Sequence, residues 1–188
     1  MNTKLVTTHI VKWLKTYAKK ANVNGFVVGV SGGVDSAVTS TLCAMTGLDV
    51  MCLEMPIHQA ESHVSRAQEH IAQLKSRFPN VNSTKVDLTP VFESFKSEID
   101  LEGSSSTVDM ALANSRARLR MTTLYYYAGL LGKDVAGTGN KVEDFGVGFY
   151  TKYGDGGVDL SPIADLLKSE VYDLGRALEI PQSILTAA

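Results

Sequence analysis

The chain has 188 residues, of which 44% are hydrophobic and 20% are charged, a composition that suits one globular domain with a sizeable core and opposes disorder. The formal net charge of -2 gives no sign of the basic face that a nucleic-acid partner requires. Two cysteines predict neither a disulfide framework nor a metal cluster, and the lack of an 18-residue apolar run or a signal-peptide pattern predicts a cytoplasmic protein with no membrane partner.

Helical and strand-like stretches alternate along the whole chain. The periodicity and turn signals predict helices at residues 3–21, 34–45, 60–77, 91–99, 108–131 and 167–178. Apolar and β-branched runs predict strands at 26–30, 50–55, 84–88 and 134–138. This alternation predicts a single α/β domain with a doubly wound parallel sheet, helices on both faces, and ligands at the carboxyl ends of the strands.

The stretch FVVGVSGGVDS at residues 26–36 joins the first predicted strand to the second predicted helix. Gly32 and Gly33 permit positive φ and carry no Cβ, so backbone amides between them can point at a bound anion. The positive end of the helix that follows would face the same anion. In its first turn, Asp35 offers a carboxylate for magnesium on the phosphates, and Ser36 offers a hydroxyl for a phosphate oxygen.

Other glycine motifs fit these residues poorly. A Walker A loop needs a lysine that is absent after Gly33, and the dinucleotide pattern G-x-G-x-x-G does not match residues 29–33. The sequence SGGVDS directly after a strand resembles instead the pyrophosphate-binding loop of N-type ATP pyrophosphatases, which cleave ATP between the α and β phosphates. A glycine turn that only packs the strand against the helix is the alternative.

Two further stretches carry polar groups to places where ligands bind. Residues 114–121, NSRARLRM, place three arginines on alternate helical positions, which spreads them over more than one face; surface ion pairs are the alternative. Residues 137–143, GTGNKVE, follow the fourth predicted strand and offer the Thr138 hydroxyl and the Glu143 carboxylate at its end. A capped turn with a solvated glutamate is the alternative for that stretch.

The last polar stretch is FYTKYGDGGVDLSP at residues 149–162. Three glycines and two acids follow a lysine between aromatic residues, which suits a loop over a flat cationic ring with a phosphate nearby, although an exposed Asp-Gly turn has a similar composition. Lys168 lies near the start of the final predicted helix, where the helix dipole disfavours a cation unless an anion compensates it. This position hints at a phosphate contact.

Taken together, these four motifs resemble the NAD synthetase family over nearly the whole chain. The resemblance implies that the nicotinate carboxylate of deamido-NAD attacks the α-phosphorus of ATP, and that ammonia then displaces AMP from the acyl-adenylate. Adenylation is chemically reasonable because it replaces an oxide leaving group with a stabilised phosphate. Magnesium would neutralise the charge on the departing pyrophosphate.

The resemblance also assigns roles to residues. Those that would bind ATP are Gly29, Val30, Ser31, Gly32, Gly33, Val34, Asp35, Ser36, Thr138 and Lys168. Those that would bind magnesium are Asp35 and Glu143, and those that would hold deamido-NAD are Asn114, Arg118, Lys152, Asp155 and Asp159. Asp35 and Lys168 would serve catalysis by position and charge, without a covalent nucleophile or a named general base.

The resemblance further implies a homodimer with the helix at 108–131 near the contact. Because no amidase domain precedes the motifs, free ammonia is the expected nitrogen donor, unless a separate glutaminase supplies it. Family members continue beyond the point that corresponds to Ala188, so we expect the domain at 1–188 to lack a C-terminal substrate-binding segment. Many relatives have a basic residue where this chain has Glu54, so the adenine contacts are not assigned.

Two other functions fit the loop. One is a related adenylating amidotransferase, such as a GMP synthetase or a tRNA-modifying ligase, although a tRNA partner would require a basic surface that the charge opposes. The other is a module that holds ATP without turnover. Loss of the metal-binding acids would mark such a module, but both Asp35 and Glu143 are present.

Overall fold

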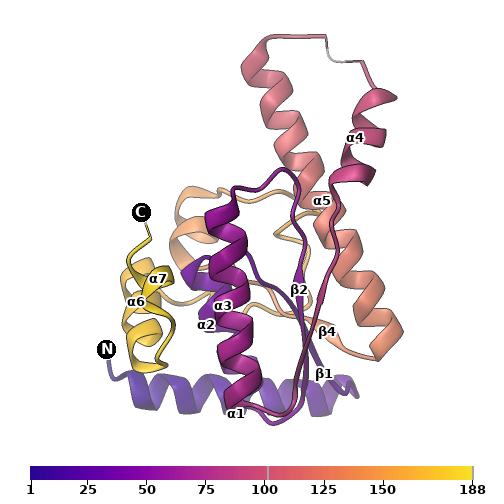
Figure 1. Cartoon of the computed structure of the whole chain (residues 1–188). Helices are drawn as coiled ribbons and strands as arrows, with labels where there is room; N and C mark the ends of the chain where they lie inside the picture. The colour runs from indigo at the N-terminus through magenta and orange to yellow at the C-terminus, as the bar shows by residue number, and fades with distance from the viewer. Residues whose placement is uncertain (101, 188) are drawn as a thin grey trace.

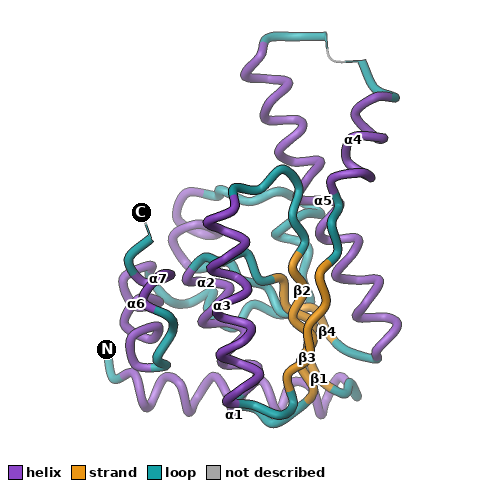
Figure 2. The backbone as a smooth tube through the Cα atoms, viewed as in Figure 1, coloured by secondary structure: helices purple, strands orange, loops and turns teal. Residues whose placement is uncertain are grey.

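The computed structural model describes residues 1–100 and 102–187, and its centre is a parallel sheet with helices on both faces (Figures 1 and 2). The strands are β1 (Gly25–Gly29), β2 (Asp49–Glu54), β3 (Val81–Lys85) and β4 (Asp134–Val135). They lie in the order β3-β2-β1-β4, and every pairing is parallel. This order confirms the predicted doubly wound sheet.

The predicted helices are all present, with small differences at their ends. They are α1 (Thr3–Ala21), α2 (Val34–Ala44), α3 (Glu61–Arg77), α4 (Thr89–Ser97), α5 (Ser105–Leu131) and α6 (Lys168–Ala177). Two elements were not predicted: a π-helix, η1 (Val142–Val147), and the short helix α7 (Gln182–Leu185). A helix of one or two turns carries too few residues for its period to show in the sequence.

The strands bury both of their faces, as their apolar runs predicted. Phe26 and Val28 of β1 point into a cluster with α1, α2, α3 and α6, whereas Val27 points to the opposite side. There it joins Leu53 and Val135 in a second cluster, beneath α4 and α5. Successive side chains therefore enter different cores, which is the two-residue period of a strand with helices on both sides.

Helix α2 lies inside the molecule. Ten of its eleven residues are buried, and the exception is Asp35, in its first turn. Several of its polar side chains are bonded within the protein: the Ser40 hydroxyl donates to the Ser36 carbonyl at 2.7 Å and contacts His70 Nε2 at 2.9 Å. The Thr39 hydroxyl is also buried but has no hydrogen-bond partner among the described residues. The core thus holds α2 rigidly and presents its N-terminal end to the edge of the sheet.

Two strand predictions differ from the structure. β3 begins at Val81 rather than Thr84, because Val81 is buried opposite Val50 of β2. Because the residues after Val81 are polar, the sequence pattern does not show where this edge strand begins. β4 ends at Val135. The Ala136 amide still donates to the Val27 carbonyl of β1 at 2.9 Å, and Ala136 forms an isolated bridge with Leu160.

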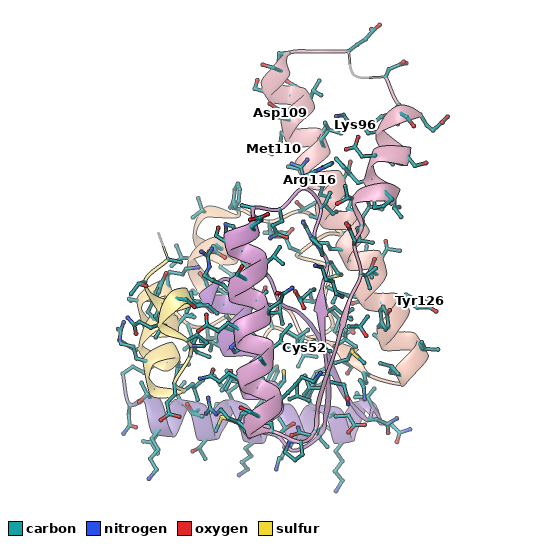
Figure 3. The ribbon with its side chains drawn as sticks, viewed as in Figure 1. Cys52, Lys96, Asp109, Met110, Arg116 and Tyr126 are labelled. Carbon is teal, nitrogen blue, oxygen red and sulfur yellow. The ribbon has the colours of Figure 1, made fainter. Side chains whose placement is uncertain are left out.

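Helices α4 and α5 form the part of the molecule that projects beyond the sheet (Figure 1). Only Leu112 and Ala128 are buried along the 27 residues of α5, and Tyr126 points away from the body of the molecule (Figure 3). Within residues 1–100 and 102–187, none of the helices combines the length and the apolar character that crossing a bilayer requires.

Candidate nucleotide-binding site

The glycine loop leaves the carboxyl end of β1, which lies between β2 and β4 where the strand order reverses. Gly32 has φ +82°, and a Cβ on this residue would lie 2.5 Å from the carbonyl oxygen of His63. Both facts require glycine at this position. Gly33 is the N-cap of α2 and makes no side-chain cap, so the positive end of that helix meets the loop directly.

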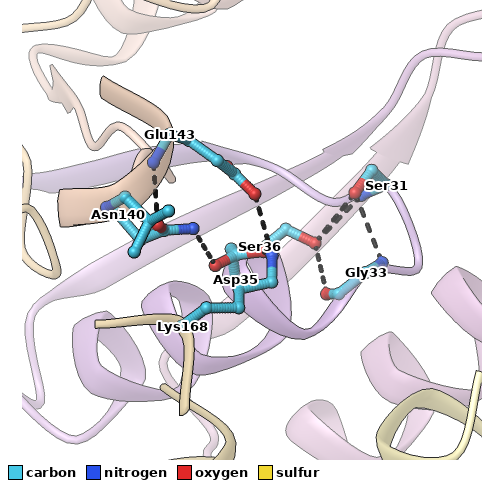
Figure 4. Close-up of polar contacts among 8 residues, drawn as sticks. Ser31, Gly33, Asp35, Ser36, Asn140, Glu143 and Lys168 are labelled. Carbon is cyan, nitrogen blue, oxygen red and sulfur yellow. Dashed lines mark hydrogen bonds and ion pairs between the residues drawn. The ribbon is translucent and has the colours of Figure 1, made fainter. Parts of the chain in front are cut away.

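Two serine hydroxyls brace this loop from within (Figure 4). The Ser36 hydroxyl accepts from the Ser31 amide at 3.2 Å and donates to the Gly33 carbonyl at 3.0 Å, while the Gly33 amide donates to the Ser31 hydroxyl at 3.3 Å. Ser36 is buried, so its hydroxyl shapes the turn from the protein side. An anion bound in this loop would replace the serine hydroxyls as the acceptor for the amides of Ser31 and Gly33.

Lys168 joins two predicted magnesium ligands at the other side of the loop. Its ammonium donates to Asp35 Oδ2 and, at 3.0 Å, to Glu143 Oε1 (Figure 4). Partial burial acts against the charged form, but the hydrogen bonds to the two carboxylates outweigh it and raise the pKa of Lys168. These carboxylates are therefore the anions that compensate a lysine at the start of α6.

The side chain of Asn140 lies beside this cluster, and the sequence did not mark it as a site residue. It is fully buried and donates from Nδ2 to Asp35 Oδ1 at 2.9 Å. The sequence signal for Asn140 was its position in the motif GTGNKVE, next to candidate metal-binding acids. An amide that is buried at such a place needs specific hydrogen-bond partners.

A further carboxylate that was not predicted packs close to the cluster. Asp144 lies over Gly139, where an added Cβ would be 1.9 Å from Asp144 Oδ2. Burial raises the pKa of the Asp144 carboxyl, and the nearby charges of Glu143, Asp155 and Asp35 raise it further. Asp144 thus adds a third carboxylate near Asp35 and Glu143, the two acids that bind Lys168.

A cavity of about 570 Å³ lies next to the glycine loop, and Lys168, Asp35 and Glu143 are not part of its lining. Its lining includes the loop residues 29–31, Thr138 at the end of β4, one side of α5, and parts of the segment 148–158. Most of the lining is apolar, with a few polar groups that include Asn114 and Asp155. Such a mixture is typical of a site for a small organic ligand.

The three alternating arginines of α5 have three different partners, which agrees with the prediction that their spacing spreads them over more than one face. Arg116 stacks on the Phe92 ring with its Cζ 5.2 Å from the centroid, and Arg118 Nε donates to the Lys152 carbonyl at 3.2 Å. Arg120 Nε donates to the Met55 carbonyl at 3.0 Å and lines the cavity. Burial, and then the charge of Arg116, lowers the pKa of Arg120. The sequence analysis selected Arg118 but missed Arg120.

Residues predicted to hold deamido-NAD order the segment 149–157. Asn114 of α5 accepts through Oδ1 from the Thr151 hydroxyl at 2.8 Å, and within the segment Asp155 Oδ1 accepts from the Thr151 amide at 2.8 Å. Both residues also line the cavity, whereas Arg118 and Lys152 are exposed and do not belong to its lining. These contacts order the loop beside the cavity.

Asp159 lies apart from the cavity lining. Its carboxylate accepts from the Val135 amide at 2.8 Å and from the Tyr125 hydroxyl at 3.0 Å. Burial, together with the hydrogen bond to Asp159, raises the pKa of Tyr125 to about 12. Asp159 therefore links β4 to α5 in this structure.

Comparison with known proteins gives consistent matches over the whole chain. A family model described as NAD synthase matches residues 6–188. The NH(3)-dependent NAD(+) synthetase of Carboxydothermus hydrogenoformans is 38% identical over 188 residues, which cover 97% of this chain and 73% of that protein.

Solved structures agree with this match. The NMN synthetase of Francisella tularensis has a TM-score of 0.90 and 33% identity, covering 100% of this chain and 75% of that one. The NH3-dependent NAD synthetase of Campylobacter jejuni, in complex with the nitrate ion, has a TM-score of 0.87 and 29% identity, covering 98% of this chain and 77% of that one.

The fold and the glycine loop define a doubly wound α/β protein with its candidate ligand site at the carboxyl ends of the strands, where the strand order reverses. The family model and the 38% identity show which family of doubly wound α/β proteins is concerned. The chain belongs to the NAD synthase family.

Proposed function

We propose that the chain is a ligase that amidates deamido-NAD to NAD with ammonia, using ATP and releasing AMP and pyrophosphate. Family membership supports the reaction. The observation that carries the proposal is the position of the glycine loop, between an apolar cavity and the cluster of Lys168, Asp35 and Glu143. Such a site can hold a phosphate chain at the loop and an organic group in the cavity.

The loop and the lysine would act on ATP. The amides of residues 29–36 and the positive end of α2 would orient the phosphates, and Thr138 would contribute a hydroxyl from the neighbouring strand end. Lys168 would turn its ammonium from the carboxylates to the phosphates as charge develops on the departing pyrophosphate. Because the loop amides and the end of α2 are fixed before the reaction, they would stabilise that charge with little rearrangement, and only the Lys168 side chain would turn.

Asp35 and Glu143 have the chemistry of magnesium ligands. Both carry carboxylate oxygens, which hard cations prefer, and both already converge on one cationic group. Magnesium held there would neutralise the charge of the leaving pyrophosphate.

The organic substrate would occupy the cavity and its rim. Asn114 and Asp155 lie in the lining, and Arg118 and Lys152 stand at the edge of the ordered segment. Asp159, which bonds the Val135 amide of β4, would hold the substrate from the side of this segment that faces β4. The likeness to the NMN synthetase supports a second candidate substrate, the corresponding nicotinate mononucleotide.

A homodimer would cover the exposed side of α5. Tyr126 and Leu130 are each 64% exposed there, next to Tyr125. Light scattering coupled to gel filtration would give twice the chain mass of 20.3 kDa for a dimer, and the single mass would reject it.

The direct test is a reaction of the purified chain with ATP, magnesium, ammonium and deamido-NAD. We expect NAD and AMP in equal amounts, with no NAD when ammonium is left out. A parallel reaction with nicotinate mononucleotide tests the second substrate. AMP without an amidated product would favour a different acceptor, and no turnover with either acid would reject the proposed reaction.

A further inference from the structure

The side chain of Asn140 connects the two carboxylates of the site. Asn140 Nδ2 donates to Asp35 Oδ1 at 2.9 Å. At its other end, Asn140 Oδ1 accepts from the backbone amides of Val142 at 3.0 Å and Glu143 at 3.1 Å (Figure 4). One buried amide therefore contacts the side chain of the first acid and the backbone of the second.

The orientation of this amide is fixed by the chemistry of its partners. Backbone N–H groups can be met only by an acceptor, and an ionised carboxylate oxygen can be met only by a donor. A flipped Asn140 would face two N–H groups with its own N–H groups, and Asp35 with its oxygen. The arrangement is thus the one that satisfies all three partners.

This amide sets the geometry of both acids. Its oxygen caps the first turn of η1, so it determines where Glu143 leaves the backbone. Its nitrogen holds the Asp35 carboxylate, which belongs to the one residue of α2 that is not buried. A buried amide that is bonded through both its oxygen and its nitrogen has little freedom to move, so the separation of the two carboxylates depends on it.

We propose that Asn140 is a positioning residue, which holds Asp35 and Glu143 at the separation at which both bind the divalent cation of the metal–nucleotide complex. This inference rests on the proposed function, in which those two acids are the metal ligands. Asn140 itself contacts neither substrate nor cation. Its effect passes through the acids that it orients.

Two variants distinguish the role of the amide nitrogen, which bonds Asp35, from that of the amide oxygen, which caps η1. Asn140→Ser keeps a hydroxyl that can cap the amides of η1, because serine is as good a cap as asparagine, but it is too short to reach Asp35. Asn140→Ala removes both functions. Asn80→Ser is the matched control: Asn80 Nδ2 donates to the carbonyls of Ala44 and Leu48 at 2.9 and 2.7 Å, far from the acids in the chain.

The first measurement is NAD formation against magnesium concentration at saturating substrates. We expect Asn140→Ser and Asn140→Ala to raise the half-saturating magnesium concentration at least tenfold. Asn140→Ser should keep a thermal midpoint close to that of the wild type. Asn80→Ser should lower the thermal midpoint and leave the magnesium response unchanged. A wild-type response in Asn140→Ser would overturn the proposal, because the asparagine would then be only a cap.

The second measurement needs no turnover. Binding of Mn²⁺, followed by electron paramagnetic resonance in the presence of α,β-methylene-ATP, should weaken at least tenfold in Asn140→Ser. Unchanged Mn²⁺ affinity would also overturn the proposal. If the wild type binds Mn²⁺ and forms no NAD, the proposed reaction fails while the positioning role is still tested by this binding.

Discussion

The carbonyl oxygen of His63 lies directly against Gly32, 2.5 Å from the place that a Cβ on Gly32 would occupy. The first turn of α3 thus packs onto the glycine loop and leaves no room for a side chain. A glycine at positive φ under such a contact makes the loop conformation depend on a neighbouring helix.

We expect Gly32→Ala to destabilise the protein by about 1–3 kcal/mol and to impair ATP binding, because the loop must move to relieve the clash. Gly33→Ala is the control for stability. Its φ is -97°, and its added Cβ would meet only the Ser31 hydroxyl, at 3.4 Å. Urea unfolding of both variants and ATP titration of Gly32→Ala check the prediction. Equal losses of stability in the two variants would contradict it.

Replacing Asp35 by asparagine should lower the rate of pyrophosphate release by about 100-fold or more, since the charge at the metal–phosphate contact is lost. The shape of the side chain is retained, and Asp35 lies at the open end of α2, so the fold should persist. Asp173→Asn, a change to a partly exposed side chain on α6, is the control. Normal pyrophosphate release by Asp35→Asn would reject the metal assignment.

Arg118→Ala should raise the KM for deamido-NAD about tenfold and leave the KM for ATP within about twofold, a loss of near 1.4 kcal/mol in substrate binding. The reason is that Arg118 holds the Lys152 carbonyl and so orders the segment next to the cavity. Steady-state kinetics with each substrate varied in turn give both KM values and test this prediction. A loss confined to ATP would show that Arg118 serves the nucleotide instead.

Arg120→Ala should lower kcat/KM at least tenfold, because it removes the partly buried guanidinium from the cavity and leaves the Met55 carbonyl without its donor. Arg116→Ala is the matched control from the same helix, since Arg116 stacks on Phe92 outside the cavity lining. Kinetics and thermal midpoints of both variants separate a site effect from a folding effect. Similar kcat/KM values in the two variants would count against a role for Arg120 in the site.

Stability should fall in acid because of His70. Burial, and then the charge of Arg77, lowers the pKa of His70 from its ordinary value of 6.5 to about 4. Between these two values the unfolded chain binds the extra proton. The free energy of unfolding should therefore decrease as pH falls from 6.5 towards 4, by up to about 1.4 kcal/mol per pH unit from this residue.

Urea unfolding of the wild type and of His70→Gln across this pH range isolates the contribution. The variant should lose stability at neutral pH, because the contact with Ser40 changes, and its pH dependence should be flatter. His9→Gln, on the exposed side of α1, should keep the slope of the wild type. A steep acid dependence in His70→Gln would assign the effect to other groups.

The sequence predicted the fold nearly completely, because helical period and buried strands are local patterns. The strand ends that depend on pairing were wrong: β3 begins at Val81 because of its partner Val50, and β4 ends at Val135, next to the bridge between Ala136 and Leu160. The π-helix η1 was missed for a similar reason. Its conformation is held by the Asn140 side chain, which no periodic pattern reveals.

Part of the candidate site could be proposed from the sequence. The glycine loop and the acids Asp35 and Glu143 stand out because their residue types suit phosphate and metal binding, and the structure places both acids against Lys168. Their roles stay predictions. The choice among the alternating arginines could not be made, since it depends on which one meets the Met55 carbonyl. Likewise, the sequence could not tell that Asp159 bonds the Val135 amide. These contacts join segments far apart in the chain.

The buried cysteines have a practical consequence. Cys43 in α2 and Cys52 in β2 are fully buried, and burial raises the pKa of both thiols, that of Cys52 to about 12 (Figure 3). A thiol reagent can therefore label the native chain only while the core is transiently open. The kinetics of labelling would report this opening for each variant, without any introduced probe.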